Sequence, residues 1–135
     1  MIITRELDYA IRVLRSLENG KKKATPDICR EEDLPLHFVY RIVKKLDCAG
    51  MVDISRGKDG GVLLACDLAT LTVHDLMTAL DGRVYVNACL QPGYVCEYRR
   101  THNGKCGAHN HMMSLQNDMD NLLRSRSIRE LIADD

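Results

Sequence analysis

The segment Met51–Ala65, MVDISRGKDGGVLLA, restricts the fold of this 135-residue chain more than any other stretch. Its first five residues alternate between apolar and polar, VLLA closes it, and RGKDGG in the middle contains three glycines and an Asp-Gly pair. Alternation with a period of two predicts a half-buried strand, and an Asp-Gly pair between strands is typical of a tight hairpin. We therefore predict a β-hairpin with Arg56 and Lys58 at its tip.

Two short helices are predicted directly before this hairpin. The first has Thr25 as its N-cap and Pro26 in the first helical position, where the missing N–H costs no hydrogen bond. A Leu-Pro pair ends it, and the second helix runs from about residue 36 to residue 49, where Gly50 closes it in a left-handed conformation. Its apolar side chains face inward and its basic ones outward. Two such helices joined by a tight turn fit a helix-turn-helix.

A helix-turn-helix followed by a basic hairpin indicates a winged helix. In that arrangement the second helix enters the major groove of DNA and the hairpin reaches phosphates or the minor groove. The alternative for RGKDGG is a plain surface turn. The chain is neutral overall, but five basic residues face only two acidic ones between residues 41 and 58. The candidate DNA-contacting residues are His37, Tyr40, Arg41, Lys44, Lys45, Arg56 and Lys58.

Further helices flank these elements. Residues 4–18 have apolar side chains at helical spacing behind Thr4 as N-cap, and residues 71–82 contain a capping-box pattern begun by Thr72. The predicted fold is therefore mainly α-helical with a small β-hairpin wing and a long C-terminal helix. Within one compact unit we expect three segments, namely a winged-helix DNA-binding domain (1–82), a cysteine-rich loop (83–107) and a dimerisation helix with a short final helix (108–135).

The C-terminal helix is predicted to carry an apolar stripe. Its members repeat at intervals of three and four residues, the spacing of a coiled-coil seam; they are Met112, Leu115, Met119 and Leu122. Such a stripe either packs on its own domain or pairs with a second copy. We predict a homodimer, because two copies match two half-sites on DNA.

Six cysteines raise the question of their redox state. Arg5, Glu6 and Asp8 interrupt the apolar start of the chain, so it does not read as a signal peptide. No apolar run approaches the ~20 residues of a membrane span. We therefore expect a cytoplasmic protein with reduced thiols, in which cysteines serve metal or redox chemistry. The scattered Cys29, Cys48 and Cys66 are expected to be core residues.

The sequence gives little support for an enzyme. GKDGG lacks the G-K-[ST] ending of a phosphate-binding loop. No serine, histidine and aspartate set and no paired carboxylates stand out. We expect a non-enzymatic protein.

The chain resembles the IscR/NsrR-type regulators, the Rrf-two family of winged-helix proteins. MIITRELDYAIRVL is similar to their opening helix, and RGKDGGVLLACDLATLTVHDLMTALDG is similar to their wing and following helix, with Val62 where an aromatic residue is usual. The resemblance covers the whole chain. It implies a homodimeric repressor or activator that binds a double-stranded DNA operator. Some members hold an iron–sulfur cluster on three loop cysteines, and others lack these cysteines.

The resemblance implies that Cys89, Cys96 and Cys106 hold a 2Fe–2S or 4Fe–4S cluster that senses redox state, iron or nitric oxide. Their spacing, C-x6-C-x9-C, is longer than is usual in the iron–sulfur branch. A cluster normally has four protein ligands. Asp8, contributed from the first helix of a partner subunit, is the favoured fourth ligand, and His109 is the alternative. A structural zinc, a thiol switch or a protein partner remain competing readings of the same fold.

Overall fold

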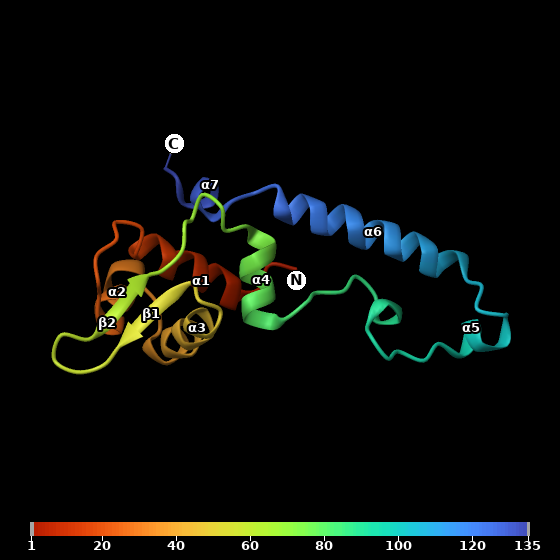
Figure 1. Cartoon of the computed structure of the whole chain (residues 1–135), viewed down its shortest axis with the longest axis horizontal. Coiled ribbons are helices and arrows are strands. Elements are labelled where there is room, and N and C mark those ends of the chain that lie inside the picture. The colour runs from red at the N-terminus through yellow and green to blue at the C-terminus, as the bar shows by residue number, and fades with distance from the viewer. Residues whose placement is uncertain (1, 135) are drawn as a thin grey trace.

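The computed structural model describes residues 2–134 (Figure 1). Thr4 caps the first helix as predicted, because the Leu7 N–H donates to its Oγ1 at 3.2 Å. The elements in chain order are α1 (Arg5–Ser16), α2 (Thr25–Glu32), α3 (Leu36–Cys48), β1 (Val52–Ser55), β2 (Gly61–Leu64), α4 (Val73–Asp81), the 3-10 helix η1 (Ala88–Leu90), α5 (Glu97–Thr101), α6 (Gly107–Arg124) and α7 (Ile128–Ile132).

The predicted helix-turn-helix is formed by α2 and α3. The predicted N-cap of α2 is wrong, because the N-cap is Ala24 and Thr25 is already the first residue of the helix. The Thr25 side chain is buried. Asp33 ends α2 in a left-handed conformation, with φ at 56°. Gly50 follows α3 with φ at 74°, the conformation predicted for it. Each helix of the motif is therefore followed by a residue in the left-handed conformation, Asp33 after α2 and Gly50 after α3.

The strands β1 and β2 form the predicted antiparallel hairpin. Val52 pairs with Leu64 and Ser55 with Gly61. Lys23 adds a further bridge on the free side of β2, because its N–H and C=O both bond to Val62 at 3.0 and 2.7 Å. A side chain at Gly61 would place its Cβ 2.8 Å from the Lys23 carbonyl oxygen, so only glycine allows this close approach.

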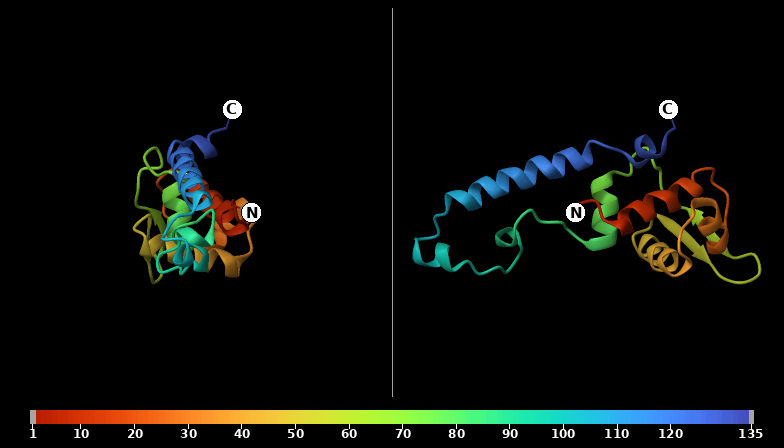
Figure 2. Two further views of the ribbon diagram at one scale, coloured as in Figure 1. Left: turned by 90° about the vertical axis from the view of Figure 1, so that its right-hand side faces the viewer. Right: turned by 180° about the vertical axis from the view of Figure 1, so that it is seen from behind.

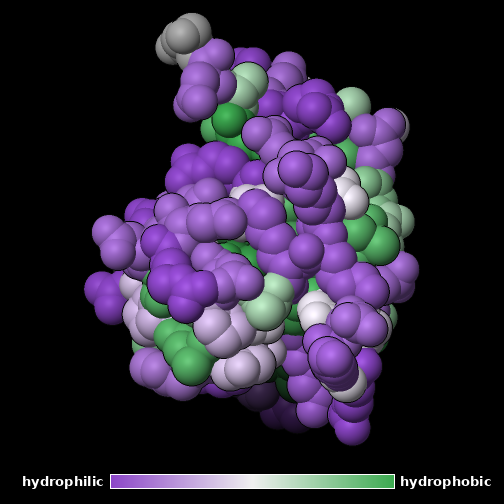
Figure 3. Space-filling model, turned by 90° about the vertical axis from the view of Figure 1, so that its left-hand side faces the viewer, coloured by the Kyte–Doolittle hydropathy of each residue, from purple (hydrophilic) through white to green (hydrophobic). Residues whose placement is uncertain are grey.

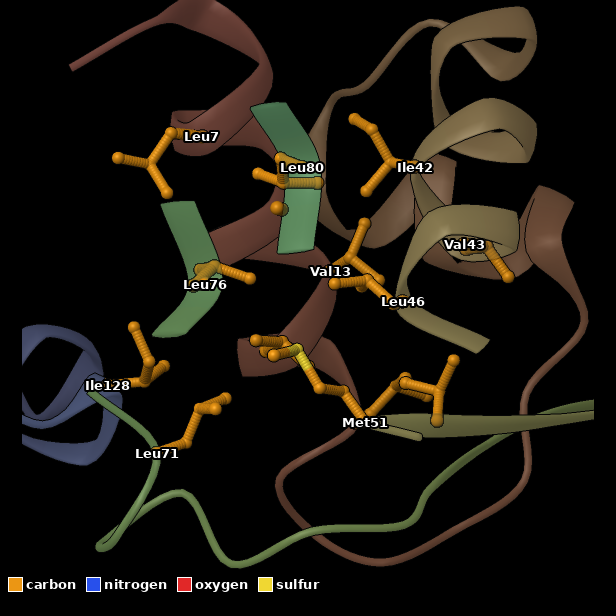
Figure 4. Close-up of a cluster of buried hydrophobic side chains, with 14 of the residues drawn as sticks. Leu7, Val13, Ile42, Val43, Leu46, Met51, Leu71, Leu76, Leu80 and Ile128 are labelled. Carbon is orange, nitrogen blue, oxygen red and sulfur yellow. The ribbon is translucent and has the colours of Figure 1, made fainter. Parts of the chain in front are cut away.

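One hydrophobic core joins the helices to the base of the wing (Figure 4). Leu7 and Val13 of α1, Ile42 of α3 and Leu76 of α4 point into it and are almost fully buried. The C-terminal helix α7 also contributes, since Ile128 is fully buried. Burial of each such side chain stabilises the fold by about 1.5–3 kcal/mol. The end of the chain is therefore part of the same core as its beginning.

The remaining residues form an arm that projects from this core. We define the arm as residues 83–126 and its first part, residues 83–107, as the cysteine loop. The loop runs outward from α4, turns at α5 and returns through α6, so that the molecule is elongated (Figures 1 and 2). Within residues 2–134, no helix is both long and apolar enough to cross a membrane.

Candidate functional site

The outer face of α3 carries most of the predicted DNA-contacting side chains. His37, Tyr40, Arg41 and Lys44 are exposed there. Lys45 differs, because it is half-buried and its Nζ pairs with Glu6 Oε1 of α1 at 2.7 Å. We therefore assign Lys45 to the packing of α3 against α1.

The wing tip presents the two remaining basic candidates. Arg56 and Lys58 are both exposed. Lys22 Nζ donates to the carbonyl oxygen of Asp59 at 3.1 Å and ties the tip to the loop before α2. The end of the molecule that carries the wing is mostly hydrophilic, with only small separate apolar areas (Figure 3). A mostly hydrophilic surface of this kind suits a polar partner better than an apolar one.

The three loop cysteines lie within or directly before helical elements. Cys89 is in η1, Cys96 is the N-cap of α5 and Cys106 is the N-cap of α6. Cys89 and Cys96 line one open hollow of about 450 Å³ together with Arg99. Cys89 also lines a smaller cavity of about 210 Å³ with His109. Cys89 is therefore common to both spaces.

The chemistry of these thiols suits a metal group, but their positions in this conformation do not. All three are half-buried free thiols, and no disulfide forms within the described residues. Thiolates are the ligands that iron–sulfur clusters require. Across residues 2–134, however, no three side chains of cysteine, histidine, aspartate or glutamate are grouped closely enough to hold a metal ion. The residues fit a cluster in kind, but this conformation of a single chain does not bring them together.

The two candidates for a fourth ligand have different surroundings. Asp8 pairs with Arg12 of the same helix at 3.1 Å, and its side chain is about half exposed. His109 lies in the arm, where its Nε2 is 3.3 Å from Arg99 Nη1. Arginine only donates, so this contact makes Nε2 the acceptor and leaves the proton on Nδ1. That Nδ1 is buried without a hydrogen-bond partner among the described residues.

The other three cysteines differ from one another. Cys29 and Cys66 are half-buried against the core, as predicted, and desolvation raises the pKa of both thiols. Cys48 is exposed, so its assignment to the core is wrong. It is the last residue of α3 and falls on the side of the helix where Lys44 faces solvent. A raised pKa keeps Cys29 and Cys66 in the unreactive thiol form.

The helix α6 reverses the usual distribution of polar and apolar side chains. Leu115 and Leu122 of the predicted seam are 53% and 64% exposed, and the two methionines of the seam are half-buried. The buried side chains are instead polar, with Gln116 at 3% and Asp120 at 5% exposure. Sequence reasoning missed both, because polar residues four apart on a helix normally indicate its solvent face.

The whole fold, from α1 through the arm to α7, matches one family. The sequence model of the Rrf2 family, described as an iron-dependent transcriptional regulator, matches residues 3–134. This chain belongs to the Rrf2 family. The family is described as one of transcriptional regulators, and the match agrees with the winged-helix fold.

Two solved structures and one further protein are also similar to this chain. The global cysteine regulator CymR of B. subtilis has a TM-score of 0.70 at 20% identity over 96% of this chain and 95% of that one. IscR of T. potens has a TM-score of 0.62 at 14% identity over 96% and 84%. Protein aau3 of Rhizobium meliloti (strain 1021) is 29% identical over 97 residues, which are 70% of this chain. The match spans only 63% of that relative's length. The two structural matches establish the Rrf2 fold.

Proposed function

We propose that this Rrf2 protein is a homodimeric, DNA-binding regulator of the cytoplasm whose operator affinity follows the state of an iron–sulfur cluster. Residues 1–82 would bind DNA, the cysteine loop would sense, and residues 108–135 would dimerise. Cys89, Cys96 and Cys106 would hold the cluster, which supplies redox chemistry when bound. The observation that carries the proposal is the match to an iron-dependent regulator family by a chain with three free thiols in one loop.

An absorbance spectrum of anaerobically purified protein tests this proposal. Bands near ~320–460 nm, together with bound iron and sulfide, are expected of an iron–sulfur protein. Colourless protein with one zinc per chain would instead support a structural metal site. The spectrum thus decides the cofactor independently of any measurement of DNA binding.

A thiol switch is the second candidate function. Two observations favour it, namely that Cys89 and Cys96 line the same hollow and that the fold is shared with a cysteine regulator. Colourless, metal-free protein whose operator affinity changes reversibly on oxidation and reduction would support this function. A bound cluster would argue against it.

Binding to the operator is expected to depend on α3 and the wing. Arg41→Ala should weaken binding to a duplex selected by the wild-type protein by about 1–3 kcal/mol, because a recognition-helix arginine commonly reads guanine. Lys58→Ala should weaken all sequences alike and flatten the salt dependence by about one unit, as expected of one lost phosphate contact. Fluorescence anisotropy over a salt series measures both effects.

A distant basic residue provides the control for this experiment. Arg126 is exposed on the connection between α6 and α7. Arg126→Ala should bind the selected duplex like the wild type. If Arg41→Ala and Lys58→Ala also bind like the wild type, the proposed DNA surface is wrong.

The fourth ligand can be identified by comparing two substitutions. Asp8→Ala is expected to shift the cluster spectrum or shorten cluster lifetime in air without abolishing assembly, because a small thiol or solvent replaces one weak ligand. Arg12→Ala is the matched control, since it removes the Asp8–Arg12 ion pair and leaves the carboxylate in place. An unchanged spectrum and lifetime in Asp8→Ala, with a change in His109→Ala, would assign the position to His109.

A further inference from the structure

The two buried polar residues of α6 form a specific connection to the start of the cysteine loop. Gln116 uses both ends of its side-chain amide. Its Oε1 accepts from the Val86 N–H at 2.9 Å, and its Nε2 donates to the Val84 carbonyl oxygen at 3.0 Å. The side chain therefore bonds to the loop backbone much as a neighbouring strand would. It fixes the position of residues 84–86 along α6.

Asp120 extends this connection by one helical turn. Its Oδ1 accepts from Gln116 Nε2 at 2.9 Å, and its Oδ2 lies 3.5 Å from Arg83 Nη2. On the other side, Oδ1 lies 3.8 Å from His74 Nε2 of α4. A carboxylate with 5% exposure is costly unless such partners surround it, so the arrangement tolerates little displacement.

This connection joins two regions that the proposed function uses, namely the cysteine loop and the helices of the DNA-binding domain. Gln116 and Cys89 line the same cavity of about 210 Å³, and Cys89 follows Val86 by only three residues. At the other end, α4 packs against both α1 and α3. The path from a loop cysteine to the α3 surface thus runs through Gln116, Asp120 and α4.

We infer that Gln116 and Asp120 are positioning residues that transmit the state of the cysteine loop to the DNA-binding helix. Movement of the loop at Cys89 pulls on residues 84–86 and breaks or reforms the hydrogen bonds of Gln116. Because Asp120 accepts from Gln116 and lies beside Arg83, two residues after the end of α4, the orientation of the arm relative to α4 changes with them. This inference rests on the proposed function, since it needs a loop whose state affects DNA binding.

Gln116→Met tests the inference, because methionine has a similar length but cannot form any of the three hydrogen bonds. The measured quantity is the ratio of operator Kd values between two loop states, cluster-loaded and cluster-free, on a duplex selected by the wild-type protein. We expect a wild-type ratio of about tenfold to fall below about twofold, with binding in the tighter state nearly unchanged. A purely structural role would instead weaken both states equally.

Asn121→Leu is the matched control, since Asn121 is an exposed amide on the same helix. It should keep the wild-type ratio. Hydrogen exchange at the Val86 amide should accelerate in Gln116→Met only, and thermal unfolding verifies that this variant is folded. A wild-type ratio in folded Gln116→Met would overturn the inference.

The spectrum separates a failure of the inference from a failure of the proposed function. If the wild-type protein binds no cluster, the proposed function fails, and the same ratio is measured between diamide-oxidised and reduced protein. Loss of that ratio in Gln116→Met would still support the connection. If operator affinity in the wild type is the same in both loop states under either treatment, there is no coupling and the inference is wrong.

Discussion

Serine in place of Cys89, Cys96 or Cys106 is expected to give nearly colourless protein after anaerobic purification. Each substitution leaves two thiolates in a loop that this conformation does not draw together, and two ligands hold a cluster too loosely to survive purification. Iron content per chain should fall by about tenfold or more, because the loss of even an outer-shell partner of a ligand weakens metal binding by about 10–100-fold. Absorbance and iron analysis measure the effect.

The remaining cysteines provide matched controls for this experiment. Cys29→Ser and Cys66→Ser should keep the cluster spectrum and cost stability, because a hydroxyl replaces a half-buried thiol. Cys48→Ser should change neither, since this thiol is exposed. A coloured protein from any of the three loop substitutions would contradict the proposed ligand set.

Leu115→Glu is expected to convert the proposed dimer into monomers at micromolar concentration. Leu115 is 53% exposed in the single chain, so the charge does not disturb the protein's own core. In a dimer built on the α6 seam, the carboxylate would be buried without a partner. That costs at least about 3 kcal/mol, roughly a 150-fold weaker dimer. Sedimentation velocity measures the change, and operator binding should fall with it.

Asn121→Glu controls for added charge on the same helix. Asn121 is exposed and is not a member of the seam. This variant should remain a dimer with wild-type unfolding temperature. If Leu115→Glu also sediments as a dimer, the interface lies elsewhere on the molecule.

The sequence predicted the winged helix well because its signals are local. The Asp-Gly hairpin, Gly50 after α3 and Thr4 before α1 each determine backbone conformation over a few residues. The exposure of Cys48 was not predictable in the same way, because periodicity determines the face of a helix poorly at its last residue.

The arm was predicted less completely, for a physical reason. Its structure depends on contacts between distant residues, such as Gln116 with Val84 and Val86, and no local pattern encodes these contacts. The exposed leucines of α6 were predicted as a seam from their spacing, which is a local signal. The candidate ligands could likewise be named from their residue types. Whether their side chains come close enough to share a metal group depends on how the chain, or two chains together, fold.

The short backbone pairing between the segments before α4 and before α7 has a consequence for how much the length of the arm can change. The Val73 N–H donates to the Arg126 carbonyl oxygen at 3.0 Å, and the Ile128 N–H donates to the Leu71 carbonyl oxygen at 2.8 Å. The arm, residues 83–126, therefore leaves the core after α4 and returns to it at this pairing, and doubling the length of a flexible closed loop costs only about 0.6 kcal/mol. We therefore expect insertions and deletions in the cysteine loop to leave the core formed by α1 to α4 and α7 folded. The length of this loop can then change at little cost to the free energy of unfolding of that core.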